Sequence, residues 1–248
     1  MTGVKIAGIT HQGRVRRENQ DAFYTWKGDN AAFGLVCDGM GGAMAGNVAS
    51  AIAAQRFVQV LSAMPGTPQP RLKRALELAN TAVYQRSRSD PSCRGMGTTL
   101  VAAFASGAQA HILNVGDSRC YLISGTEVRQ VSEDHSLVEE LVRMGRLTEE
   151  EARVHPNRNI ITRALGTEHQ VRGDLFSEHL EPGERLLLCS DGLTNEVSDR
   201  ELGELMKETL EESCQALLQC ALDRGAQDNV TVVLLEAEGP QPEDQPTK

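Results

Sequence analysis

The sequence lacks several features that would place it in a familiar class of protein. It has no uninterrupted apolar stretch of the roughly 20 residues that a membrane helix needs. Its first residues, MTGVKIAGIT, contain neither a long apolar run nor a small-residue cleavage site, so we expect no secretory signal. Positive charge is scarce too, because the formal net charge is -9. This balance argues against a nucleic-acid binder that works by general phosphate attraction.

Metal-binding cysteine pairs and nucleotide-binding glycine motifs are also missing. The six cysteines contain no C-x-x-C pair, and three lie in apolar runs typical of strands. We therefore expect buried, reduced thiols in a cytoplasmic protein, rather than disulfides or zinc ligands. The glycines at 39, 41 and 42 do not follow G-x-G-x-x-G, and no G-x-x-x-x-G-K-[ST] occurs. A nucleotide-binding site thus lacks its usual support.

What the sequence does contain is typical of a soluble globular protein. Its 248 residues are 40% hydrophobic and 24% charged, enough for one large domain or two small ones. No convincing domain boundary appears, so we expect a single domain over 1–237 and a polar, disordered tail over 238–248. The proline-rich stretch 63–70 predicts a loop between helices.

Short apolar runs predict strands, and these occur in clusters rather than in strict alternation with helices. The expected strands are at about 4–9, 20–26, 33–37, 98–105, 110–115, 119–124, 184–190 and 229–236. This clustering favours an α+β fold with mainly antiparallel sheets over a doubly wound parallel sheet.

Helices are predicted between the strands. An apolar stripe at helical spacing covers 71–87, and small residues over 43–63 would let a second helix pack closely on the layer beneath it. Capping boxes, formed by Thr148 with Glu151 and by Ser198 with Glu201, predict helix starts near 149 and 199.

Aspartates recur where the predicted strands begin or end. The stretch FGLVCDGMGG places a carboxylate and glycines directly after an apolar run, and LLLCSDG and ILNVGD repeat the pattern. The five carboxylates at strand edges are Asp21, Asp38, Asp117, Asp191 and Asp228. Each alone could be an ordinary turn or cap residue. Together, on strands of one sandwich, their side chains can converge.

Convergence would have a chemical consequence. Two carboxylates about 4 Å apart repel by roughly 1 kcal/mol in water and about 4 kcal/mol at an effective dielectric near 20. A cluster must therefore bind protons or cations, and all-oxygen ligands select hard ions such as Mg²⁺ or Mn²⁺. Two such ions suit phosphate chemistry. Arg16, five residues before Asp21, is a candidate to hold phosphoryl oxygens, although it could equally be a surface arginine.

The ordered motifs of the chain resemble those of the metal-dependent, type 2C protein serine/threonine phosphatases, and the bacterial branch most closely. The resemblance runs from about residue 4 to 236. It rests on GRVRRENQDA (13–22), CDGMGG (37–42), GMGTTL (95–100), VGDSRCYL (115–122), EDHS (133–136), ITRALG (161–166), CSDGL (189–193) and QDNVTVV (227–233).

The resemblance implies a fold and a metal centre. The fold would be a four-layer α-β-β-α sandwich with two antiparallel sheets face to face. Asp38 would bridge two core Mn²⁺ or Mg²⁺ ions, the Gly39 carbonyl would hold the second, and Asp191 and Asp228 would hold the first. Asp21 would bind metal-linked water and orient the nucleophile, and Arg16 would bind the substrate phosphate. Asp117, with Asp191, would hold a third, weaker ion beside a mobile flap at about 137–160.

Two positions depart from the family pattern. Met40 replaces the histidine that animal members place after the Asp-Gly pair as a proposed general acid, so the acid is unidentified. Gln20 replaces a common glutamate, although its neutral oxygen could still hold a metal-bound water. His135 is a tempting alternative acid, but the resemblance makes it structural.

The resemblance implies hydrolysis of phosphoserine and phosphothreonine in proteins by a metal-bridging hydroxide. The expected partners are phosphorylated proteins and a cognate bacterial serine/threonine kinase, so a role in signalling is expected. The chain is expected to be a monomer. No Cys-x5-Arg motif occurs, which argues against a phosphoenzyme. Two alternatives stay open: a pseudophosphatase that binds without turnover, and a metal-dependent hydrolase of small phosphorylated molecules.

Overall fold

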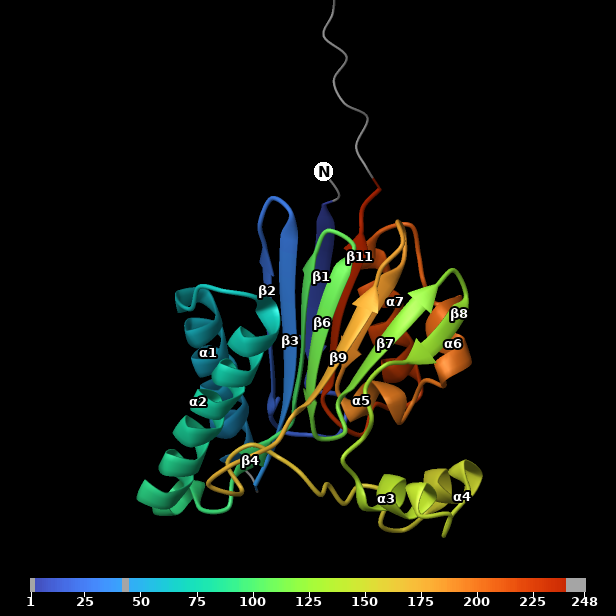
Figure 1. The fold of residues 1–248 in the computed structure, drawn as a ribbon. Coiled ribbons are helices and arrows are strands. Elements are labelled where there is room, and N and C mark those ends of the chain that lie inside the picture. Colours follow the sequence, from blue (N-terminus) through green and yellow to red (C-terminus); the bar gives the residue numbers. More distant parts are fainter. Residues whose placement is uncertain (1–2, 42–44, 240–248) are drawn as a thin grey trace, which may run out of the picture.

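The strands form two antiparallel sheets (Figure 1), in a computed structural model that describes residues 3–41 and 45–239. One sheet has the order β1 (Val4–His11), β11 (Val230–Ala237), β10 (Arg185–Cys189), β7 (Arg119–Ser124) and β8 (Glu127–Gln130). The other has the order β2 (Asp21–Lys27), β3 (Ala31–Met40), β5 (Leu100–Ser106), β6 (Gln109–Val115) and β9 (Asp174–His179), and β4 (Gly97–Thr98) pairs with β3. We call them the five-stranded and the six-stranded sheet.

Helices cover the outer faces of both sheets. The six-stranded sheet is covered by α1 (Ala45–Ala63) and α2 (Pro68–Ser89). The five-stranded sheet is covered by α5 (Asp191–Thr194), α6 (Asp199–Glu204) and α7 (Leu210–Asp223). Two short helices, α3 (Leu137–Arg143) and α4 (Glu149–Val154), lie beyond one end of the sheets, below α5 in Figure 1. A 3-10 turn, η1 (Pro91–Cys93), follows α2. The expected four-layer α+β sandwich is confirmed.

Strand β3 shows why the sequence has a continuous apolar run here. Successive side chains of a strand point to opposite faces. Phe33, Leu35 and Cys37 accordingly join the cluster under α1 and α2, whereas Ala32 and Val36 join the cluster between the two sheets. Because both faces are covered, both sets of side chains must be apolar.

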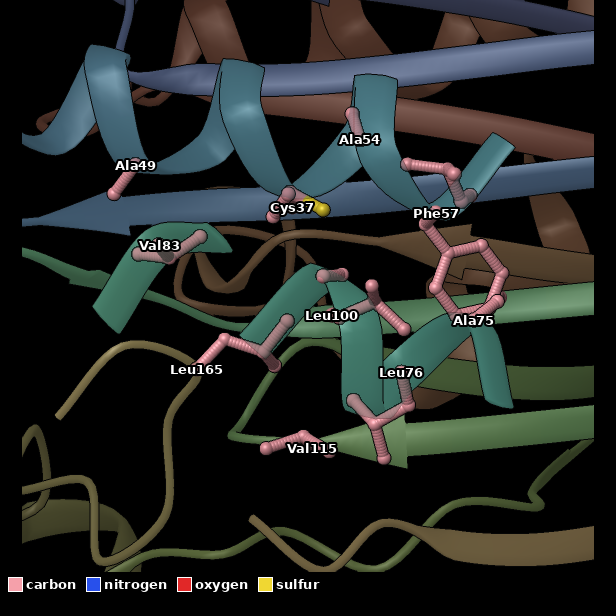
Figure 2. Close-up of a cluster of buried hydrophobic side chains, with 14 of the residues drawn as sticks. Cys37, Ala49, Ala54, Phe57, Ala75, Leu76, Val83, Leu100, Val115 and Leu165 are labelled. Carbon is pink, nitrogen blue, oxygen red and sulfur yellow. The ribbon is translucent and has the colours of Figure 1, made fainter. Parts of the chain in front are cut away.

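Helix α1 packs closely on this sheet because the residues that it presents are small. Ala45, Ala49 and Ala53 recur every four residues along the helix, and all three are buried. Figure 2 shows Ala49 and Ala54 of α1 above Cys37 of β3, with Phe57 further along the helix. Ala75, Leu76 and Val83 of α2 complete the layer, as the stripe at 71–87 predicted.

Most predicted elements are present, with differences at edges and ends. The eight expected strands all form, but β3 extends to Met40 because β4 pairs with its last residues. Asp38 therefore lies within a strand rather than after one. Helix α2 begins at Pro68, so the loop before it is shorter than the stretch 63–70. The capping boxes at Thr148 and Ser198 both form.

The edge strands β8 and β9 were not predicted. Both are rich in polar residues, with sequences EVRQ and DLFSEH, because an edge strand leaves part of its surface in water. Of the tail expected at 238–248, residues 240–248 lie outside the described residues. All six cysteines are free, and five of them are buried, as expected, while Cys220 is half-buried.

Among the described residues, no helix combines the length and the apolar character that a membrane span requires.

Candidate metal centre

Asp21 and Asp38 face each other across two neighbouring strands. They are register partners in the β2–β3 pair, so their side chains leave the same end of the six-stranded sheet. Asp21 Oδ2 accepts hydrogen bonds from the Ser190 hydroxyl at 2.8 Å and the Thr231 hydroxyl at 2.6 Å. Ser190 follows β10 and Thr231 lies in β11, so one carboxylate joins the two sheets.

The backbone of Asp38 is fixed by two threonines. Its amide donates to the Thr99 hydroxyl at 2.9 Å, and its carbonyl accepts from the Thr99 amide at 2.9 Å and the Thr98 hydroxyl at 2.8 Å. Thr99 in turn shares a hydrogen bond of 2.7 Å with Ser118. The GMGTTL motif thus holds one candidate ligand rigidly in place.

The other three aspartates come from segments next to strands at this same end. Asp191 begins α5, two residues after β10, and Asp228 comes two residues before β11. Asp117 lies in the tight turn between β6 and β7. Each of these positions agrees with the sequence-based expectation.

The carboxylates are close enough to disturb one another's ionisation. Burial raises the pKa of Asp38 well above its usual range, and the negative charges of the other four aspartates raise it further. Burial also raises the pKa of Asp21 to about 7 and that of Asp117 to about 8. The pKa of Asp191 is raised by burial and by Asp228, and hydrogen bonds with Asp38 and Asn195 oppose the shift.

The oxygens that remain unpaired fit a hard cation. Asp21 Oδ1, Asp117 Oδ1 and Asp191 Oδ1 are buried, and none has a hydrogen-bond partner in the described part of the chain. A buried, unpaired carboxylate oxygen is costly unless a proton or cation satisfies it. Oxygen donors without imidazole or thiolate favour Mg²⁺ or Mn²⁺ over zinc.

The side chains are not already arranged as a ligand shell. Within residues 3–41 and 45–239, no group of three or more His, Cys, Asp or Glu side chains is placed to hold one ion. Asp228 instead forms an ion pair with Arg16, whose Nη2 lies 2.6 Å from Asp228 Oδ2. The charges of the other four aspartates all act on Asp38, so the five carboxylates form one loose cluster. The individual ligand assignments stay predictions.

Arg16 lies at the mouth of this cluster, and Asn229 anchors the segment that carries it. The Asn229 side chain accepts from the Gln20 amide at 2.8 Å and donates to the Gln12 and Glu18 carbonyls, both at 2.9 Å. Asn229 itself is buried, and the three bonds that it makes are half-buried. The segment 12–20 is thereby joined to the residue that follows Asp228.

Gly39 must be a glycine for steric reasons. A Cβ at this position would overlap the carbonyl oxygen of Gly46 in α1, and it would lie 2.6 Å from the Gln20 carbonyl oxygen. The Gly39 amide donates to that same Gln20 carbonyl at 3.1 Å. The close approach of three backbone segments explains the Asp-Gly pair without reference to metal binding.

His135 has structural hydrogen bonds, in line with the expectation. It is 3% exposed, and its Nδ1 accepts from the Gly116 amide at 3.1 Å. Its Nε2 lies 3.0 Å from Asp174 Oδ2. Since Gly116 directly precedes Asp117, His135 links the turn that carries Asp117 to β9.

Sequence reasoning missed the residues that hold the aspartates. The motifs contain these residues, but the sequence indicates no role for them: Thr99, Ser190, Asn229 and Thr231. One sign was available, because Thr231 is a polar residue inside the apolar run NVTVVLL. Partners this far apart in sequence could be identified only once the two sheets were placed together.

The fold and the site define an α+β sandwich protein with a carboxylate centre suited to divalent cations. The chain matches the family model described as protein phosphatase 2C over residues 10–234. It is 40% identical over 235 residues to the serine/threonine phosphatase stp of Listeria monocytogenes, covering 92% of this chain and 93% of that protein.

Solved structures agree with this match. The serine/threonine phosphatase Stp1 of Staphylococcus aureus superposes with a TM-score of 0.89 at 37% identity, covering 95% of this chain and 96% of that one. The catalytic domain of the phosphatase PstP, in complex with two manganese ions, superposes with a TM-score of 0.85 at 34% identity, covering 96% and 100%. The chain therefore belongs to the protein phosphatase 2C family, and the resemblance found in its motifs is confirmed.

Proposed function

We propose that this protein hydrolyses phosphoserine and phosphothreonine in phosphorylated proteins, with Mn²⁺ or Mg²⁺ as cofactor, and that residues 1–237 act as one phosphatase domain. Family membership supports the reaction class, and the relative with two manganese ions supports the cofactor. The observation that carries the proposal is the cluster of five buried or half-buried aspartates with three unpaired oxygens.

The proposed roles of the residues are those that the family resemblance implies, and the positions of the five aspartates support them. Asp38, Gly39, Asp191 and Asp228 would hold two core ions, and Asp117 with Asp191 would hold a third, weaker one. When bound, the ions supply a hydroxide nucleophile at neutral pH and positive charge for the phosphoryl oxygens. Asp21, held by Ser190 and Thr231, would orient the attacking water through its free Oδ1.

Arg16 would bind the phosphoryl group. Its guanidinium is 53% exposed and has one carboxylate partner, so it can reach a substrate while staying next to the aspartates. A guanidinium can bind two phosphoryl oxygens at once, which fixes the group for attack. The leaving seryl or threonyl oxygen needs a proton, and Met40 cannot donate one. The proton must then come from water or from another group.

The wider setting is part of the same proposal. A phosphatase of this kind would oppose a serine/threonine kinase in a bacterial signalling system and would act as a cytoplasmic monomer. The bacterial phosphatases that resemble the chain support this setting.

The test is hydrolysis of a phosphothreonine peptide by the purified chain with Mn²⁺, with EDTA, and with Asp191→Asn. We expect turnover with Mn²⁺ only, and at least a ~10²-fold loss in the variant, because a missing charge-stabilising group costs about that much. A panel of sugar and nucleotide phosphates run alongside distinguishes a small-molecule hydrolase. Equal activity in wild type and variant would contradict the metal assignment, and no turnover of any substrate would indicate a binding protein.

A further inference from the structure

A large cleft opens from the candidate metal centre toward the flap (residues 137–160). Its volume is about 1010 Å³, and it lies between α3, α4 and the segment that carries α5 and α6. Asp117 and Asp191 line it, and the unpaired Oδ1 of Asp117 belongs to a side chain that is nine-tenths buried. A phosphoryl group needs only the inner end of such a space, so the remainder is free for neighbouring residues of a substrate.

The walls of this cleft are strongly acidic. Among the described residues that line it, nine are carboxylates and three are arginines. Two of the arginines are already neutralised, since Arg119 pairs with Asp134 at 2.8 Å and Arg224 pairs with Glu201 at 2.5 Å. Negative charge therefore prevails beyond the metal centre itself.

Three of these carboxylates form no direct ion pair with another described residue, although the charges of Arg143 and Arg119 act on Glu139 and the Arg224 guanidinium lies beside Glu196. Across the described part of the chain, no arginine or lysine forms an ion pair with Glu139, Glu149 or Glu196. These three residues approach the cleft from different elements: α3, α4 and the segment between α5 and α6. All three line the same cleft, so their fields add there.

Apolar side chains line the cleft between the acidic groups. Val142 of α3 and Ala152 and Val154 of α4 belong to its wall, and Val154 is 79% exposed. A lysine or arginine side chain has an apolar stem and a charged end, so it matches a wall that is apolar near the backbone and acidic at the rim.

We propose that this cleft selects phosphorylated segments in which basic residues flank the phosphoserine or phosphothreonine. The inference rests on the proposed function, and it names the substrate class of that same site. Lysine or arginine residues would lie against Val142 and Val154 and interact with Glu139, Glu149 and Glu196. Arg158, which lines the cleft and has no acidic partner among the described residues, would oppose this selection.

The experiment compares three phosphothreonine peptides that differ only in flanking residues, which are Lys, Gln or Glu. We expect kcat/KM with Mn²⁺ to fall in that order, by about 2- to 5-fold for each charge, as for partly exposed ion pairs. Raising the salt concentration should reduce the differences, because the charges are partly exposed. The variant Glu149→Gln/Glu196→Gln should lose most of the preference for Lys while hydrolysing the Gln peptide at the wild-type rate.

Two further variants test the origin of the preference. Arg158→Gln should increase the preference for the Lys peptide by roughly 2-fold. Glu77→Gln, the matched control, removes an exposed carboxylate from α2, on the other side of the sandwich, and should change nothing.

Equal kcat/KM for the three peptides, or a preference that survives in the double variant, would overturn the inference and leave the proposed function intact. Failure to hydrolyse any of the three peptides would overturn the proposed function, and this inference with it.

Discussion

The carboxylate cluster and the flap lie next to each other but are built differently. Asp21 and Asp38 are fixed by strand pairing and by hydroxyl groups from distant parts of the chain. The flap consists of two short helices and exposes apolar side chains, with Met144 64% exposed and Val154 79% exposed. Under the proposed function, the carboxylate cluster would perform the chemistry and the flap side would contact the substrate.

The largest expected effect concerns the rigid end. Asp38→Asn should lower kcat by at least ~10²-fold, because it removes a charge at the centre of the cluster without changing the shape of the side chain. Activity against a phosphothreonine peptide and Mn²⁺ binding by calorimetry would measure it. Asp29→Asn, at an exposed position, is the control and should behave as wild type. Normal Mn²⁺ binding and turnover in Asp38→Asn would show that the carboxylate cluster is not the metal centre.

The second prediction concerns Arg16, which lies next to the carboxylate cluster and is proposed to bind the substrate phosphate. Arg16→Ala should lower kcat/KM for a phosphopeptide by about 10- to 100-fold, the range for a lost hydrogen bond to a charged group. Arg16→Lys should recover only part of this loss, because lysine cannot bind two oxygens in one plane. Arg17→Ala serves as the neighbouring control. If Arg16→Ala and Arg17→Ala have equal effects, the assigned role of Arg16 is wrong.

The third prediction concerns Asn229, whose hydrogen bonds hold the segment that carries Arg16 next to the carboxylate cluster. Asn229→Ala removes the acceptor of the half-buried Gln20 amide and the donor to the Gln12 and Glu18 carbonyls, which should cost about 1–3 kcal/mol in the free energy of unfolding. We also expect KM for a phosphopeptide to rise more than kcat falls. Gln219→Ala, at an exposed hydrogen bond on α7, provides the control. A loss of stability with unchanged KM would limit Asn229 to a purely structural role.

The smallest effect is a pH dependence of stability in the metal-free protein. Asp117 has a pKa raised to about 8, so the folded state keeps a proton that the unfolded state releases near pH 4. The stabilisation from this proton is complete below about pH 4 and is lost as the pH rises through about 8. In EDTA, the melting temperature of wild type should therefore fall between pH 4 and 8.

Asp117→Asn removes this titration. Its melting temperature in EDTA should exceed that of wild type by roughly 5 °C at pH 8, and by much less near pH 4. Parallel curves for the two proteins across this range would show that Asp117 is not held protonated by its surroundings.

Much of the architecture could be predicted from the sequence because its causes are local. The apolar run at 33–37 predicted β3, the small residues over 43–63 predicted α1, and capping boxes located the starts of α4 and α6. Strands β8 and β9 were missed because their short sequences, EVRQ and DLFSEH, have mixed polarity and contain no apolar run. The extension of β3 past Asp38 depends on pairing with β4, a contact between residues far apart in sequence.

The sequence by itself determined which residues could serve the chemistry, namely five aspartates beside strand ends and one arginine near them. Only the tertiary structure decided that the aspartates meet, that Ser190 and Thr231 hold Asp21, and that Asn229 anchors the segment of Arg16. The reason is that secondary structure depends on neighbours along the chain. The distance between two carboxylates depends on how two sheets pack, which no short stretch of sequence specifies.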